Sequence, residues 1–133
     1  MSQEPKLTLD QQRADFAWKK TKEATDGRFI DEYTNVAKST ASLIMNSGLM
    51  QTLAFLKAKS SNSNEHKALL SHLLKWIDIR FLTKKMDSAP PMFEVVMTEL
   101  HRADSSSYMQ LTSETMALLR WIRQFADARK AMG

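Results

Sequence analysis

The stretch from Ser107 to Ala131 decides the fold, and it reads SYMQLTSETMALLRWIRQFADARKA. Its apolar side chains recur at spacings of three and four, which is typical of an amphipathic α-helix. The apolar arc consists of Leu111, Thr115, Leu118, Leu119, Ile122, Phe125 and Ala126. The opposite arc carries Arg120, Arg123, Asp127 and Lys130. The pattern therefore predicts one long C-terminal helix with a buried face and a basic stripe.

Further segments with helical periodicity precede this one. They cover residues 9–25, 30–46, 49–58, 65–83 and 92–102. Thr8, with Gln11 three residues later, is a capping signal for the first segment. Gly48 or Asn46 can form a left-handed C-cap for the second. Residues 60–64 have no apolar side chain and no helical period, so they are expected to form a loop.

Composition limits the class of fold. Three glycines and three prolines in 133 residues leave too few turn formers for a many-stranded sheet. We therefore predict an all-α fold, a single compact bundle of about five to six helices. The length suits one domain over residues 1–133, with a core at about 9–131.

Cysteine content, hydropathy and charge limit the class of function. The absence of cysteine excludes disulfides, thiolate metal sites and a cysteine nucleophile. No apolar run approaches the roughly 20 residues that span a bilayer, and Met1 to Asp10 lack the apolar stretch of a signal peptide. These features favour a cytoplasmic protein that makes no membrane contact. The net charge of +4 favours phosphate-rich partners.

The residue types that support catalysis do not converge in this sequence. His66, His72 and His101 lack the spacing of helical zinc sites. Asp31 and Glu32 are adjacent and so point in different directions on a helix. No phosphate-binding glycine loop and no nucleophile elbow occurs. We therefore expect no enzyme, no catalytic residue, no metal and no cofactor.

Two cations of the first helical segment lie at an unusual position. Arg13 and Lys20 are seven residues apart, so they share the apolar side of the helix with Leu9 and Phe16. Their aliphatic stems can lie along the core edge while their charged groups reach water. Alternatively, the two charges are reserved for a partner. The sequence leaves both interpretations open.

Three segments carry a resemblance to a known family. They are RADFA at 13–17 with Lys19 and Lys20 following, NSGLMQTLAFL at 46–56, and LLRWIRQFA at 118–126. In this order and spacing, across roughly residues 9 to 131, they resemble the small helical subunit of type III-B CRISPR, or Cmr, RNA-guided effector complexes.

This resemblance implies a non-catalytic subunit that assembles, in more than one copy, beside the guide-binding backbone of the complex. Its expected partners are the other subunits, copies of itself, the guide RNA and the target RNA. Cations would neutralise RNA phosphates, while base pairing with the guide supplies sequence specificity. We assign this nucleic-acid-binding role to six residues: Arg13, Lys20, Lys57, Lys59, Arg120 and Arg123. Lys57 and Lys59 would extend the same patch only if their helix packs beside the first.

Two alternative functions remain open. A helix-turn-helix regulator would use Leu49 to Lys59 as its recognition helix, but that segment is rich in apolar side chains where base-reading polar groups are needed. A helical protein–protein adaptor would carry its basic residues for solubility alone. Salt-sensitive binding to RNA of any sequence favours the CRISPR function, and a preference for one duplex DNA site favours the regulator. The absence of both kinds of binding favours the adaptor.

Overall fold

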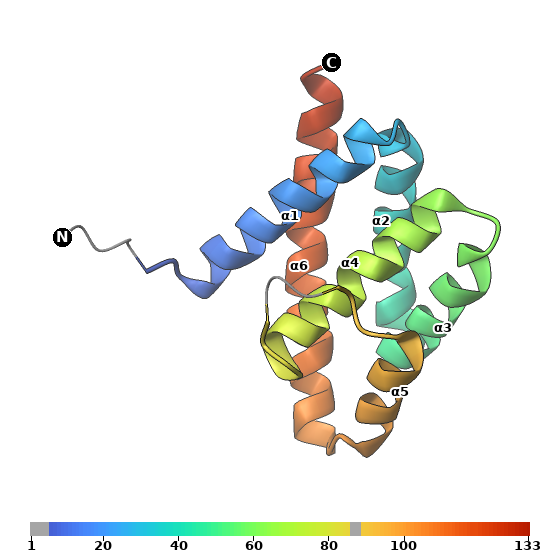
Figure 1. The fold of residues 1–133 in the computed structure, drawn as a ribbon, viewed down its shortest axis with the longest axis vertical. Coiled ribbons are helices and arrows are strands. Elements are labelled where there is room, and N and C mark those ends of the chain that lie inside the picture. The colour runs from blue at the N-terminus through green and yellow to red at the C-terminus, as the bar shows by residue number, and fades with distance from the viewer. Residues whose placement is uncertain (1–5, 86–88) are drawn as a thin grey trace.

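The computed structural model describes residues 6–85 and 89–133. The described residues form six helices and no strand, so the predicted all-α bundle is confirmed (Figure 1). The helices are α1 Leu9–Asp26, α2 Ile30–Ser47, α3 Leu49–Ser60, α4 Asn64–Phe81, α5 Phe93–Arg102 and α6 Ser105–Ala131. The prediction of one domain over 1–133 includes segments 1–5 and 86–88, which lie outside the described residues, and it stays a prediction.

Side-chain caps set where the helices begin. The predicted capping box of α1 is present, because Thr8 Oγ1 accepts from the Gln11 amide at 3.1 Å and Gln11 Oε1 accepts from the Thr8 amide at 2.8 Å. The Asp104 carboxylate accepts from the Ser107 amide at 2.7 Å and starts α6 two residues earlier than the periodicity indicated. Ser63 caps α4 in the same way, which shortens the expected loop at 60–64.

Gly48 joins α2 to α3 with no intervening loop. Its φ of +85° and ψ of 167° lie in a region that is essentially restricted to glycine. Its amide donates to the Ile44 carbonyl at 2.9 Å, and its carbonyl accepts from the Thr52 amide at 3.2 Å. Gly48, rather than Asn46, is thus the C-cap of α2. The two helices form a tight hairpin.

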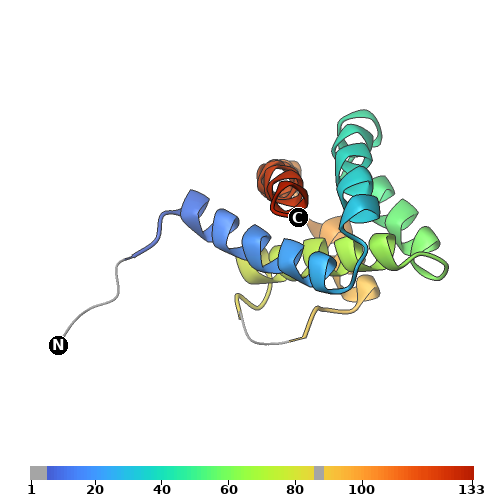
Figure 2. The ribbon, with the colours of Figure 1, turned by 90° about the horizontal axis from the view of Figure 1, so that it is seen from above.

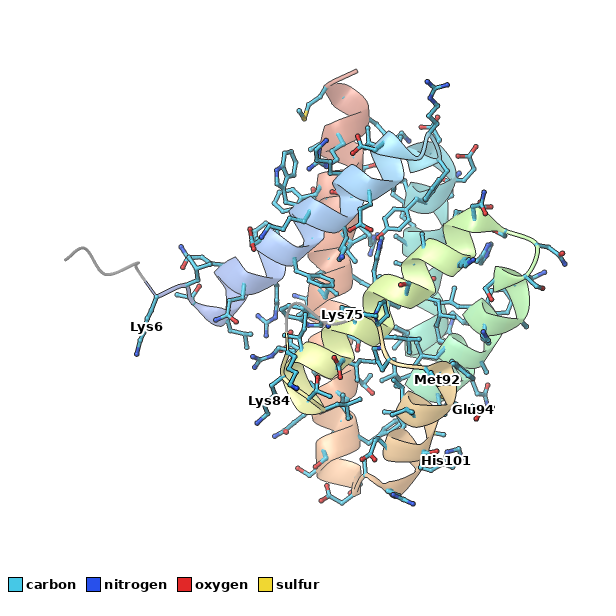
Figure 3. All side chains as sticks on the ribbon, viewed as in Figure 1. Lys6, Lys75, Lys84, Met92, Glu94 and His101 are labelled. Carbon is cyan, nitrogen blue, oxygen red and sulfur yellow. The ribbon has the colours of Figure 1, made fainter. Side chains whose placement is uncertain are left out.

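The helices pack in layers around α4. The long α6 crosses α1 and runs alongside α2, and α3 packs against α4 and α2 (Figures 1 and 2). From His72 to Ile79 every side chain of α4 is buried, including the ion pair between Lys75 and Asp78 at 3.5 Å. Lys75 (Figure 3) also donates to the Lys85 carbonyl at 2.8 Å. Among the described helices none is long and apolar enough to cross a bilayer.

Candidate nucleic-acid interface

Arg13 forms an internal ion pair. Its Nε donates to Glu114 Oε2 at 2.6 Å and its Nη2 donates to Glu114 Oε1 at 2.9 Å, while Nη1 contacts Asp10 at 3.3 Å. Glu114 also accepts from Trp76 Nε1 at 3.1 Å and lies 4.0 Å from Arg80 Nε. Burial opposes ionisation of Glu114, but the hydrogen bonds from Arg13 and Trp76 outweigh it and lower the pKa of that carboxyl. The charge of Arg13 is therefore largely balanced inside the protein.

Lys20 also has an internal partner. Its Nζ donates to Glu23 Oε2 at 2.9 Å and lies 5.3 Å from the centre of the Phe16 ring. Glu23 Oε1 is 3.3 Å from Nε2 of the buried His72, whose Nδ1 is 2.8 Å from the Tyr33 hydroxyl. Because a carboxylate only accepts, His72 Nε2 carries the proton and Nδ1 accepts from Tyr33. The hydrogen bond from His72, supported by Lys20, lowers the pKa of Glu23 to about 2.

A hollow beside α6 brings three of the six predicted residues together. Arg13 of α1 and Arg120 and Arg123 of α6 line it. Asp10, Lys38, Ala117, Trp121, Gln124 and Asp127 complete the lining. Among these described residues Arg13 is balanced by Glu114 and Lys38 pairs with Asp127, so Arg120 and Arg123 supply the positive excess over Asp10. We define this lining as the α6 basic hollow.

Lys38 is the residue of this hollow that sequence reasoning missed. It is exposed on α2 and lies 3.4 Å from Asp127 Oδ1 of α6, 89 positions further along the chain. The periodicity of residues 30–46 indicates only that Lys38 faces solvent. Its position beside α6 follows from the packing of α2 against α6. No local signal in the sequence reports that contact.

Lys57 and Lys59 form a separate group. They lie in the last turn of α3, where α3 packs against α4, α2 and α5. Figures 1 and 2 both show α2 between α3 and α6. The third helix does not pack beside the first helix in the way that an extended patch requires. Lys57 instead lines a different hollow together with Lys67.

Trp121 is held in place at the edge of the α6 basic hollow. Its Nε1 donates to Asp10 Oδ1 at 2.9 Å, and its ring centre is 5.2 Å from that of Phe125. Phe125 in turn makes an edge contact with Trp18 at 5.1 Å. The guanidinium of Arg129 covers Trp18, 3.6 Å from its ring centre. The three rings and Arg129 form a continuous row between α1 and α6.

The histidines and carboxylates do not form a metal site. In residues 6–85 and 89–133 no group of three or more such side chains lies close enough together to hold a metal ion. His72 is buried with Tyr33, His66 contacts Ser63 at 2.6 Å, and His101 on α5 points away from the bundle (Figure 3). Within the described part of the chain, the hollow offers cations for electrostatic contact, and its two carboxylates, Asp10 and Asp127, bind Trp121 and Lys38.

Comparison with known proteins identifies the family of this chain. Residues 9–129 match the family model described as CRISPR-associated protein (Cas_Cmr5). The curated protein "CRISPR system Cmr subunit Cmr5" from Thermus thermophilus is 30% identical over 121 residues, which is 91% of this chain and 95% of that protein.

A solved structure has the same fold. It is the X-ray crystal structure of a CRISPR-associated Cmr5 family protein from Thermus thermophilus, with a TM-score of 0.73 and 28% identity. The match covers 92% of this chain and 97% of that one. The resemblance predicted from the three sequence segments is confirmed, and this chain belongs to the Cas_Cmr5 family of CRISPR-associated proteins.

Proposed function

We propose that this chain is a non-catalytic small subunit of a type III-B CRISPR effector complex in the cytoplasm and contacts RNA phosphates through the α6 basic hollow. Its partners are the other subunits of the complex, copies of itself, the guide RNA and the target RNA. The relative from Thermus thermophilus is named as a Cmr subunit, which supports the assembly. The observation that carries the RNA contact is the convergence of Arg120, Arg123 and Lys38 at one hollow.

The contact works by electrostatics and not by base reading. Cations that neutralise phosphates release bound counterions, so the affinity falls with salt and does not depend on sequence. Sequence specificity then belongs to base pairing between the guide and the target. This division of roles fits a hollow that is open to solvent and lined by long charged side chains.

The six predicted residues do not contribute equally. Arg120 and Arg123 come first, because no internal carboxylate holds either guanidinium by a hydrogen bond among the described residues. Arg13 comes next, since it lines the hollow but Glu114 holds its Nε and Nη2. Lys20 is tied to Glu23. Lys57 and Lys59 would bind phosphates elsewhere on the surface, on the α3 side.

The test is charge reversal in the assembled complex. Arg120→Glu with Arg123→Glu should weaken retention of target RNA uniformly across sequences and reduce the salt slope by about two units, one for each lost phosphate contact. The matched control is Lys19→Glu with Lys22→Glu, because these side chains on α1 are 67% and 62% exposed and lie outside the hollow. Equal retention by both variants would overturn the assignment.

The alternative functions predict other results in the same preparations. A preference of the isolated chain for one duplex DNA sequence would establish a regulator. However, Leu49, Thr52, Leu53 and Leu56 of α3 are buried, so its apolar side is already used for packing. Recovery of protein partners without any RNA would establish an adaptor.

A further inference from the structure

Trp121 differs from the other tryptophans in what surrounds it. Trp76 is 1% exposed and belongs to the core, and Trp18 has the Arg129 guanidinium over its ring at 3.6 Å. Trp121 is half-buried, with Phe125 on one side and the α6 basic hollow on another. The hydrogen bond from its Nε1 to the exposed Asp10 and the contact with the Phe125 ring both orient the indole. The ring is therefore pre-oriented, so a planar ligand that binds it causes little loss of side-chain entropy.

The charges around this indole match a nucleotide. Arg120 and Arg123 flank Trp121 in the sequence and line the same hollow, and Lys38 lines it from α2. Ala117 also lines it, one helical turn before Trp121, with a side chain too small to fill the space. An aromatic face beside several cations is the arrangement that binds single strands, since the base stacks while the cations contact the backbone.

We propose that the α6 basic hollow binds one unpaired nucleotide of an RNA strand, with its base stacked on Trp121 and its phosphate held by Arg120, Arg123 and Lys38. This inference rests on the proposed function and adds to it a preference for single-stranded over paired RNA. A base inside a duplex is stacked on both faces, so its π-face is closed to an indole. A phosphate-only contact would accept duplex and single strand alike.

The experiment compares the full-length chain with three tryptophan variants at low salt. The probes are a short single-stranded RNA that carries 2-aminopurine and the same sequence as a duplex. Trp121→Leu should weaken single-strand binding by about tenfold, within the range of roughly 5- to 150-fold that base stacking is worth, and should abolish quenching of 2-aminopurine. Binding of the duplex should not change. Trp121→Phe should retain most of the affinity, and Trp18→Leu should have no effect on either RNA.

A second measurement on the unaltered protein covers the case in which Trp121→Leu does not fold. Single-stranded RNA with 5-bromouridine is irradiated with the chain, and the crosslinked peptide is identified by mass spectrometry. A crosslink at Trp121 supports the inference. Crosslinks that map only to other residues overturn it.

The outcomes separate this inference from the proposed function. If folded Trp121→Leu binds single strands as tightly as the original chain, the stacking role is wrong. In that case, weaker binding of both the single-stranded RNA and the duplex by the Arg120→Glu, Arg123→Glu variant would still support phosphate contact. If the original chain binds neither RNA, alone or in the complex, both proposals are wrong.

Discussion

Removal of the Glu114 carboxylate should destabilise the protein more than removal of any exposed acid. The Glu114 side chain is 8% exposed and receives hydrogen bonds from Arg13 at 2.6 and 2.9 Å and from Trp76 at 3.1 Å. Breaking a buried ion pair by deletion of one partner costs about 3–5 kcal/mol, because the remaining charge is left unpaired. Arg13 keeps 19% exposure and a contact with Asp10, so we expect the lower end, about 3 kcal/mol.

The assay is chemical denaturation at pH 7, followed by helical circular dichroism. Glu114→Ala should lower the free energy of unfolding by about 3 kcal/mol, or the melting temperature by about 10 °C. Glu114→Gln keeps an acceptor for Trp76 and should cost less. Asp15→Ala, which breaks the exposed pair with Lys19 at 2.9 Å, should cost under about 1 kcal/mol. A Glu114→Ala cost as small as that of Asp15→Ala would refute the reasoning.

A double-mutant cycle isolates the pair itself. Arg13→Met with Glu114→Met should recover part of the loss seen in Glu114→Met alone, because Arg13 is then not left as an unpaired charge and only Arg80, 4.0 Å from the Glu114 carboxylate, loses its neighbouring acid. We expect a coupling energy of about 1–3 kcal/mol, as is typical of residues in one ion-pair network. Simple additivity of the two single losses would show that Arg13 and Glu114 do not depend on each other.

Further predictions concern acid stability and the α2–α3 turn. The folded pKa of Glu23, about 2, lies below the usual 4.5, so the stabilisation from its carboxylate is present above pH 4.5 and is lost as pH falls toward 2. Glu23→Gln should therefore flatten this part of the curve of unfolding free energy against pH. An unchanged curve would contradict the expectation. Gly48→Ala should cost about 1–3 kcal/mol in unfolding free energy through backbone strain at φ +85°, since an added Cβ meets only Tyr108 Oη at 3.8 Å. Gly133→Ala is the control, because Gly133 lies outside the helices and an added Cβ there meets nothing within 4 Å. An equal, negligible cost for both variants would refute the argument.

The fold was predictable because its signals are local. The period of 3.6 in the stretch that became α6, the capping box at Thr8 and the single glycine at the α2–α3 turn each depend on residues within a few positions of one another. Errors were confined to helix ends, where a cap such as Asp104 competes with the apolar period for the boundary. The family resemblance depends on the same local segments, and it too was confirmed.

The candidate site was predictable only in part. Helical periodicity correctly placed Arg13 and Lys20 on the core side of α1, and both side chains are partly buried. Periodicity could not identify Glu114 as the partner of Arg13, since 101 positions separate them. Nor could it join Lys38 to the arginines of α6 or separate Lys57 from them. Their roles in RNA contact stay predictions.

The sequence by itself therefore determined the helices, the turn at Gly48, the net positive charge and the family, because each depends on neighbouring residues or on composition. Only the tertiary structure decided which charges pair with a distant carboxylate and which cations lie together on the surface. Arg13, Lys20 and Lys38 meet carboxylates, while Arg120 and Arg123 line the hollow beside Trp121 to which Arg13 and Lys38 also contribute. The physical reason is that charge pairing depends on distance in space, and the packing of α6 against α1 and α2 sets those distances.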